Sequence, residues 1–196
     1  MNNNSKTAGI LIIILGVIIL ASVIGFAYFT YINTPVHFDP QRRAAATRLF
    51  ESVMNTDLVN DYPRTPQEVM RYFLDISRLI YSGMIVNEDL YPALVAQMRN
   101  LLGPELLMLN SFEEQLATVM DSVAVFAELG IFQTGWEQLP PLFDTADPTV
   151  AYIRATQSFN TGETFYWLYS FERVIPGNEW RIVRFDRTDE NFNVIR

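Results

Sequence analysis

The chain has 196 residues with no cysteine and a single histidine, His37, and it carries 14 basic against 22 acidic side chains. The absence of cysteine excludes disulfides, iron–sulfur clusters and cysteine-ligated zinc, and a lone histidine cannot build a multi-histidine metal site. The part after residue 32 holds 13 arginines against 22 acidic residues, a net charge of −9. This acidity argues against nucleic acid as a partner, because nucleic-acid binding needs a basic surface.

After a polar tail at residues 1–7, residues 8–32 form an apolar stretch without a single charged side chain. A helix of this length spans roughly 37 Å, enough to cross a bilayer core about 30 Å thick. No small-x-small cleavage site follows it, and Phe26, Tyr28, Phe29 and Tyr31 gather at its end, as aromatic residues do at membrane interfaces. The sequence therefore predicts an uncleaved single-pass transmembrane helix that contacts the lipid bilayer through residues 8–32.

The orientation of this helix rests on opposing signals. Lys6 precedes it, whereas Arg42, Arg43 and Arg48 follow it, and the positive-inside rule applied to these charges places the domain in the cytoplasm. The three arginines start about ten residues beyond the helix, however, within reach of the folded domain. With a tail this short, we expect a cytoplasmic N-terminus and an extracytoplasmic C-terminal domain at the cell membrane.

Residues 33–42 contain Pro35 and Pro40 and read as a linker, after which residues 43–196 form one domain. Helices are expected over residues 43–123, the first at 43–54. The clearest helix starts at Thr65, where Pro66 at the first helical position and Glu68 three residues after the cap complete a capping box. Gly83 is its natural stop.

A further helix is expected from Asn87 to the Gly103–Pro104 pair, followed by a short helical turn at 104–109. Ser111 then opens another helix, with Glu114 closing a second capping box. Strands are expected over residues 124–190. Residues 124–133 fit either a first strand or an extension of the preceding helix.

From residue 149 onward apolar side chains recur at every second position, which is typical of strands. Residues 149–159, 163–175 and 179–187 are separated by turn sequences and predict an antiparallel meander. In the middle strand Phe165, Trp167, Tyr169 and Phe171 share one face, which we expect to be the core side. The fold class is therefore α+β, with helices packed on a C-terminal antiparallel meander.

Three stretches of the chain carry a recognisable pattern, with the residues Thr65, Pro66, Glu68, Val69, Gln97, Arg99, Leu101, Glu105, Leu106, Leu107, Asn110, Trp180 and Ile182. In these residues the chain resembles a family of small uncharacterised membrane-anchored proteins of Gram-positive anaerobes. The resemblance covers about residues 65–187 and implies no activity, since the family has no established one. Its architecture is similar to the cystatin-like cone shared with nuclear transport factor 2, which can leave a pocket. A shared fold does not confer a function.

Such a cone could place Tyr152, Trp167, Tyr169, Arg184 and Asp186 around an apolar cavity, where burial would raise the pKa of the carboxyl group. The alternative is that the aromatic residues belong to the core and that Arg184 and Asp186 form a surface pair. The chain has no P-loop, dinucleotide-binding glycine pattern, zinc helix or nucleophile elbow. We therefore expect no catalytic residue, no metal and no cofactor.

The function expected from these features is that of a membrane-tethered, non-enzymatic binding or scaffold module of the bacterial cell envelope, with a protein or cell-wall partner. The alternative is a small-ligand-binding or enzymatic pocket within the domain. An enzyme needs convergent polar groups in a deep cavity, whereas a scaffold needs an exposed apolar patch or an open strand edge.

Overall fold

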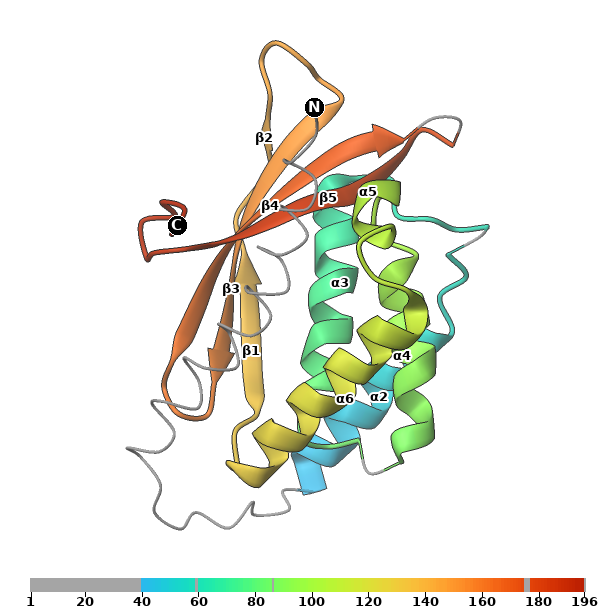
Figure 1. Cartoon of the computed structure of the whole chain (residues 1–196), viewed down its shortest axis with the longest axis vertical. Helices are drawn as coiled ribbons and strands as arrows, with labels where there is room; N and C mark the ends of the chain where they lie inside the picture. The colour runs from blue at the N-terminus through green and yellow to red at the C-terminus, as the bar shows by residue number, and fades with distance from the viewer. Residues whose placement is uncertain (1–39, 59, 86, 175–176, 196) are drawn as a thin grey trace, which may run out of the picture.

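The computed structural model describes residues 40–58, 60–85, 87–174 and 177–195, which form two layers, a sheet and a set of helices on one of its faces (Figure 1). The helical elements are α2 (Pro40–Met54), α3 (Pro66–Ile80), the 3-10 turn η1 (Glu88–Leu90), α4 (Tyr91–Arg99), α5 (Pro104–Leu107) and α6 (Phe112–Glu128). The strands are β1 (Gln133–Gln138), β2 (Leu142–Phe143), β3 (Val150–Phe159), β4 (Thr164–Val174) and β5 (Glu179–Thr188). The α+β class with an antiparallel sheet is thus confirmed.

The apolar stretch at 8–32, for which a transmembrane helix is predicted, lies outside the described residues. Among the helices that the structure describes, none combines the length and apolar character needed to cross a bilayer.

Both predicted capping boxes are present, and they explain where two helices begin. The Thr65 hydroxyl accepts a hydrogen bond from the Glu68 amide at 3.2 Å, while the Glu68 carboxylate accepts one from the Thr65 amide at 3.1 Å. In the second box the Ser111 hydroxyl accepts a hydrogen bond from the Glu114 amide at 3.1 Å, and the Glu114 carboxylate accepts one from the Ser111 amide at 2.8 Å. Each box satisfies backbone donors that the first helical turn leaves open.

The sheet has the strand order β1-β3-β4-β5, all antiparallel, with the short β2 pairing with β3 beside β1. Strands β3, β4 and β5 form the predicted meander. The four aromatic residues of β4 predicted for the core side, Phe165, Trp167, Tyr169 and Phe171, are all buried. They lie on the face that the helices cover, which we call the inner face.

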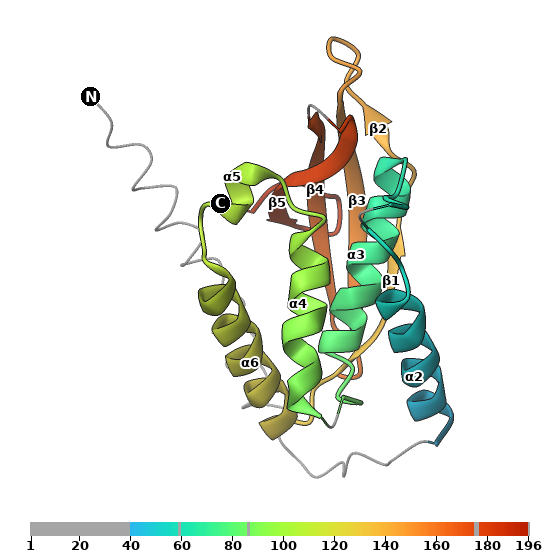
Figure 2. The ribbon, with the colours of Figure 1, turned by 90° about the vertical axis from the view of Figure 1, so that its right-hand side faces the viewer.

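Helix α3 lies against the inner face, with α2 and α4 on either side of it and α6 beyond α4 (Figure 2). Its buried stripe includes Val69, Leu74 and Ile76, and the rings of Phe73 and Tyr169 form a T-shaped pair with ring centres 5.7 Å apart. By contrast, α6 buries only Val119 and Phe126. The core is therefore built around α3, and α6 contributes few buried residues to it for a helix of its length.

Three predicted boundaries are wrong. Helix α2 starts at Pro40 and so extends three residues before the start expected at 43. The helix expected from 87 to 103 is shorter, since η1 precedes α4 and α4 ends at Arg99. The strands expected from 124 start only at Gln133. Of the two alternatives for residues 124–133, the extension of the preceding helix is the one observed through Glu128, because Phe126 continues the buried stripe begun by Val119 and Gly130, with φ +65°, ends the helix.

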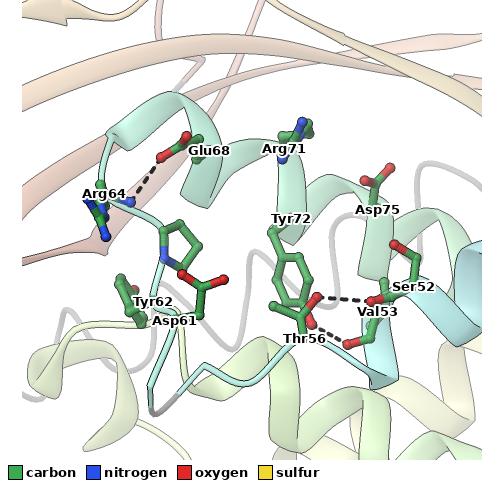
Figure 3. A pocket seen from close by; sticks show the side chains of 11 residues that line it. Ser52, Val53, Thr56, Asp61, Tyr62, Arg64, Glu68, Arg71, Tyr72 and Asp75 are labelled. Carbon is green, nitrogen blue, oxygen red and sulfur yellow. Dashed lines mark hydrogen bonds between the residues drawn. The ribbon is translucent and has the colours of Figure 1, made fainter.

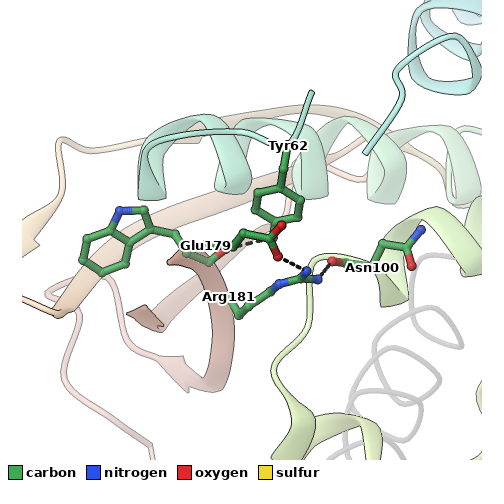
Figure 4. A network of polar contacts seen from close by, with 5 residues as sticks. Tyr62, Asn100, Glu179 and Arg181 are labelled. Carbon is green, nitrogen blue, oxygen red and sulfur yellow. Dashed lines mark hydrogen bonds and ion pairs between the residues drawn. The ribbon is translucent and has the colours of Figure 1, made fainter. Parts of the chain in front are cut away.

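The outer edge of β5 is hydrogen-bonded to the segment that follows α4. The Ile182 amide donates to the Leu101 carbonyl oxygen at 2.9 Å, and the Gly103 amide donates to the Ile182 carbonyl oxygen at 2.8 Å. Next to this contact, Arg181 donates to the Asn100 carbonyl oxygen and pairs with Glu179 (Figure 4). The last strand is thereby fastened to the helical layer.

Candidate functional site

A cavity of about 190 Å³ lies between the inner face of the sheet and helices α3, α4 and α6. We call it the inner cavity. Its lining includes eight aromatic side chains, Phe73, Tyr81, Phe126, Phe159, Phe165, Trp167, Tyr169 and Phe185. No charged residue lines it. Such a cavity favours apolar and aromatic molecules over ions.

Polar groups in the inner cavity are few, and most of them are already paired. The Gln157 amide nitrogen donates to the Ser77 hydroxyl at 2.7 Å, and that hydroxyl donates in turn to the Gln133 amide oxygen at 3.4 Å. The exception is Trp167, which is 5% exposed and whose indole N–H has no hydrogen-bond partner among the described residues. Leaving such a donor unpaired costs about 1–3 kcal/mol.

The two tyrosines that line the inner cavity are uncharged near neutral pH. Burial raises the pKa of the Tyr169 phenol well above its usual value of 10.0, so this group stays neutral. Burial likewise raises the pKa of Tyr81. These phenols can donate and accept hydrogen bonds without carrying charge, which suits recognition of a neutral molecule.

Of the five residues predicted for one pocket, the structure brings only Trp167 and Tyr169 together at the inner cavity. Tyr152 lies between the buried Ala151 and Ile153 and so belongs to the opposite face of β3.

Arg184 and Asp186 also lie on that opposite face, where the Arg184 Nε and a carboxylate oxygen of Asp186 are 2.8 Å apart. This is the surface pair of the alternative interpretation. The five residues therefore do not converge on a single cavity.

A bulge in β5 explains why Arg184 and Asp186 turn outward. Ile182 pairs with Phe171 and Arg184 with Ser170, so Val183 is an extra residue without a partner in β4. Without it, Arg184 would share the inner face with the buried Ile182. The bulge shifts the inward and outward alternation of the following side chains by one residue, so that Phe185 rather than Arg184 lies on the inner face.

Two cavity residues that the sequence analysis missed are Ser77 and Gln157. Ser77 interrupts the apolar stripe of α3, and Gln157 occupies an inward position of β3 between Ala155 and Phe159. The sequence did contain a signal for both cavity residues: each is polar at a position where the apolar pattern around it predicts a buried side chain. Such residues need partners, and here they pair with each other.

A second, polar hollow of about 480 Å³ lies between the end of α2 and the start of α3 (Figure 3). Two of its acidic residues already have structural partners, since Glu68 belongs to the capping box and Asp75 accepts a hydrogen bond from the Trp136 indole at 3.0 Å. Burial raises the pKa of Asp75, while the Trp136 hydrogen bond and the charges of Arg71 and Arg78 oppose the rise. We assign these contacts to the fold rather than to chemistry.

The described residues contain no group of three or more histidine, aspartate or glutamate side chains placed to hold a metal ion. The outer edge of β1 and β2 has no strand partner within the described part of the chain. At that edge Leu142 and Phe143 are each 52% exposed, and Leu139 is exposed as well. An open edge with apolar side chains is a surface where a further strand can add.

Comparison with known proteins assigns the chain to a family but gives it no activity. The family described as "Domain of unknown function (DUF6715)" matches residues 1–185, so the chain belongs to this family. No curated protein and no solved structure matches it. The expected membership in an uncharacterised family is confirmed, while the membrane anchor, the Gram-positive anaerobic source and the cystatin-like cone stay predictions.

Proposed function

We propose that this protein is a membrane-tethered, non-enzymatic binding module of the bacterial cell envelope, and that the inner cavity takes a small, largely apolar molecule with one hydrogen-bond acceptor. The observation that carries the proposal is the buried, unpaired indole N–H of Trp167 in an aromatic lining. An acceptor atom on the ligand would satisfy this donor, and the aromatic walls would hold a ring edge-to-face.

The size of the cavity sets the size of the ligand. A cavity of roughly 150 Å³ lined by apolar side chains binds benzene, and drug-sized ligands need pockets of about 300 Å³ or more. The inner cavity, at about 190 Å³, fits one ring with a short substituent. We therefore expect a single-ring compound that carries a carbonyl or ether oxygen.

Two further features support the proposal. The charge-free stretch at 8–32 would hold the domain at the membrane, with the domain on the extracytoplasmic side. The packing of the long helix α3 against an antiparallel sheet is what a cystatin-like cone would show, and that architecture leaves room for a pocket. Both the cone and the anchor belong to the proposal.

The orientation is tested with two reporters fused after Arg196, one active only outside the cytoplasm and the other active only inside. Activity of the first alone supports an envelope module. Activity of the second alone would place the domain in the cytoplasm and make Arg42, Arg43 and Arg48 positive-inside residues.

The cavity is tested with two ligands of the same shape, acetophenone, which has a carbonyl oxygen, and α-methylstyrene, which has a methylene group in its place. The full chain in lipid nanodiscs, labelled at the indole nitrogens of its three tryptophans, gives one N–H signal for each. Acetophenone should move the Trp167 signal in the direction of hydrogen bonding and bind about fivefold more tightly than α-methylstyrene, as one added hydrogen bond gives.

The Trp167→Phe variant should bind both ligands equally. Trp136→Phe is the matched control, because the Trp136 indole is paired with Asp75 and does not line the cavity, so the preference for acetophenone should persist. The proposal is wrong if neither compound perturbs Trp167, or if Trp167→Phe keeps the full preference.

A protein partner is the second candidate function, and the open edge of β1 and β2 favours it. We take the occupant to be a second copy of this chain, because two identical antiparallel edges can pair about a two-fold axis and bury Leu139, Leu142 and Phe143 of both copies. A shared membrane would raise the effective concentration of the two copies.

A photocrosslinker placed at position 142 of the full chain tests this second candidate. It should give an adduct of about twice the chain mass of 22.5 kDa, and the same crosslinker at Glu190 should not. The absence of that adduct at position 142, or an adduct of another mass, would remove self-pairing.

A further inference from the structure

A third hollow, of about 680 Å³, lies between α2, the end of α3 and the start of β1. Three arginines line it: Arg42 and Arg48 from α2, and Arg78 from α3. We call it the arginine groove. No acidic side chain is part of its lining. A concentration of positive charge in a chain of net charge −8 indicates that the groove suits an anion.

Within the described part of the chain, none of these three arginines forms an ion pair with a carboxylate, since the two ion pairs there involve Arg181 and Arg184. Two acidic residues lie one helical turn from these arginines, Asp75 before Arg78 on α3 and Glu51 after Arg48 on α2, and neither lines the groove. The positive charge of the groove is thus not neutralised by its own lining.

Arg42 is held in place, whereas Arg48 and Arg78 are exposed. The central carbon of the Arg42 guanidinium lies 3.8 Å from the centre of the Phe132 ring, and one of its nitrogens donates to the Ser82 carbonyl oxygen at 3.5 Å. A guanidinium has five N–H donors, so most of them stay available for a ligand. One oriented and two adjustable arginines suit a phosphate group.

The groove also has apolar lining residues, among them Ala45, Leu49, Leu79 and Met84, next to uncharged polar ones such as Thr134. A ligand that fills it therefore combines an anionic head with an apolar part. A phospholipid has this composition, and a free phosphate ion does not.

The position of the groove in the chain favours the same ligand. Arg42 lies in the first turn of α2, and seven residues, 33–39, separate α2 from the proposed transmembrane segment. Seven residues reach at most about 25 Å, so the start of α2 has to stay near the bilayer surface. This step rests on the membrane tether of the proposed function.

We infer that the arginine groove binds the headgroup of an anionic phospholipid, with Arg42, Arg48 and Arg78 contacting the phosphate and the apolar wall accommodating the adjoining part of the lipid. The contact orients the domain on the membrane that anchors it. Each arginine near an anionic surface strengthens such binding by about fivefold.

The full chain in nanodiscs of phosphatidylglycerol or of phosphatidylcholine tests the inference, with the rate of Arg42 modification by phenylglyoxal as the readout. Phosphatidylglycerol should slow the modification of Arg42 by about fivefold or more relative to phosphatidylcholine. Arg64 and Arg71, which line the polar hollow, report general attraction to the surface and should change little.

The double variant Arg48→Gln/Arg78→Gln should lose the protection of Arg42, and because both side chains are exposed the fold should persist. The matched control Arg64→Gln/Arg71→Gln removes the same charge from the polar hollow and should keep the protection. Equal rates in both lipids, or equal protection in the two double variants, would overturn the inference.

A third arm adds inorganic phosphate to the phosphatidylcholine nanodiscs. Protection of Arg42 equal to that in phosphatidylglycerol would make free phosphate the ligand and overturn the lipid assignment. Failure of the chain to insert into any nanodisc would instead overturn the membrane tether of the proposed function, and the two failures are told apart by co-purification of chain and lipid.

Discussion

The ring of Tyr62 is covered by the guanidinium of Arg181, whose central carbon lies 4.4 Å from the ring centre (Figure 4). The Tyr62 hydroxyl donates to the carbonyl oxygen of Trp180 at 2.8 Å. Burial raises the pKa of Tyr62 far above its usual 10.0, so the hydroxyl keeps its proton and this donor role. Because Tyr62 precedes α3 and Arg181 lies in β5, the pair joins the entrance of the central helix to the last strand.

Replacing Tyr62 with phenylalanine should lower the free energy of unfolding by about 1 kcal/mol, since it removes one partly buried hydrogen bond and keeps the ring under Arg181. Urea unfolding of the full chain in nanodiscs measures the change. Tyr152→Phe is the control, because Tyr152 lies on the outer face of the sheet, and it should change stability by less than about 0.5 kcal/mol. Equal effects of the two substitutions would contradict the role given to the Trp180 contact.

Replacing Asp75 with asparagine should stabilise the protein increasingly as the pH rises above 3.8. Burial raises the pKa of Asp75 in the folded state above the ordinary 3.8, so the folded chain binds more protons than the unfolded chain between these two values. The wild type loses stability across that window, whereas asparagine has no proton to lose and still accepts a hydrogen bond from Trp136.

Unfolding free energies of Asp75→Asn and of the wild type, measured at a series of pH values, check this prediction. The pKa values of Glu114, Asp147 and Asp189 are lowered, and these groups make the unfolding free energy rise with pH. This rise is the same in both proteins, so it cancels when the two unfolding free energies are subtracted. A difference that stays constant, or that falls with rising pH, would show that burial does not dominate at Asp75.

Local patterns in the sequence predicted the parts of the fold that depend on neighbouring residues. The capping boxes at Thr65 and Ser111 and the inward face of β4 follow from spacings of three and two residues, so the chain itself displays them. The extension of α6 to Glu128 was harder to predict, because Val125 and Phe126 suit a strand as well as a helix.

The candidate site depended on contacts that no local pattern displays. The bulge at Val183 changes which side chains of β5 face inward, and nothing in the strand sequence marks the extra residue. The pairing of Ser77 with Gln157 joins residues from α3 and β3, and the unpaired state of the Trp167 indole depends on everything around it. The members of the cavity are therefore visible only in the folded chain.

Replacing Gly103 with alanine should destabilise the protein by about 1–3 kcal/mol, as overpacking of a tight contact does. A Cβ atom at this position would lie 2.9 Å from a methyl carbon of Val183, and the Gly103 amide is tied to the Ile182 carbonyl oxygen. The residue therefore cannot move away without loosening the edge of β5. Thermal unfolding of the full chain measures the loss.

The double variant Gly103→Ala/Val183→Ala separates crowding from other effects. Shortening Val183 removes the methyl carbon that the new Cβ atom would meet, so the second substitution should cost less in the Gly103→Ala background than in the wild type. Strictly additive losses would mean that Gly103 matters for another reason than its closeness to Val183.

Replacing Ser111 with alanine should loosen α6 while leaving α3 nearly unchanged. The substitution removes the cap from the Glu114 amide, a loss of about 1 kcal/mol, and Val119 and Phe126 are the only buried residues of α6 that compensate for it. Amide hydrogen exchange in α6 should therefore speed up about fivefold through local opening.

The matched substitution Thr65→Ala removes the corresponding cap of α3, whose eight buried residues should make it open only with the whole core. Exchange in α6 that matches the wild type, or that rises equally in α3, would mean that α6 does not open independently beside the inner cavity.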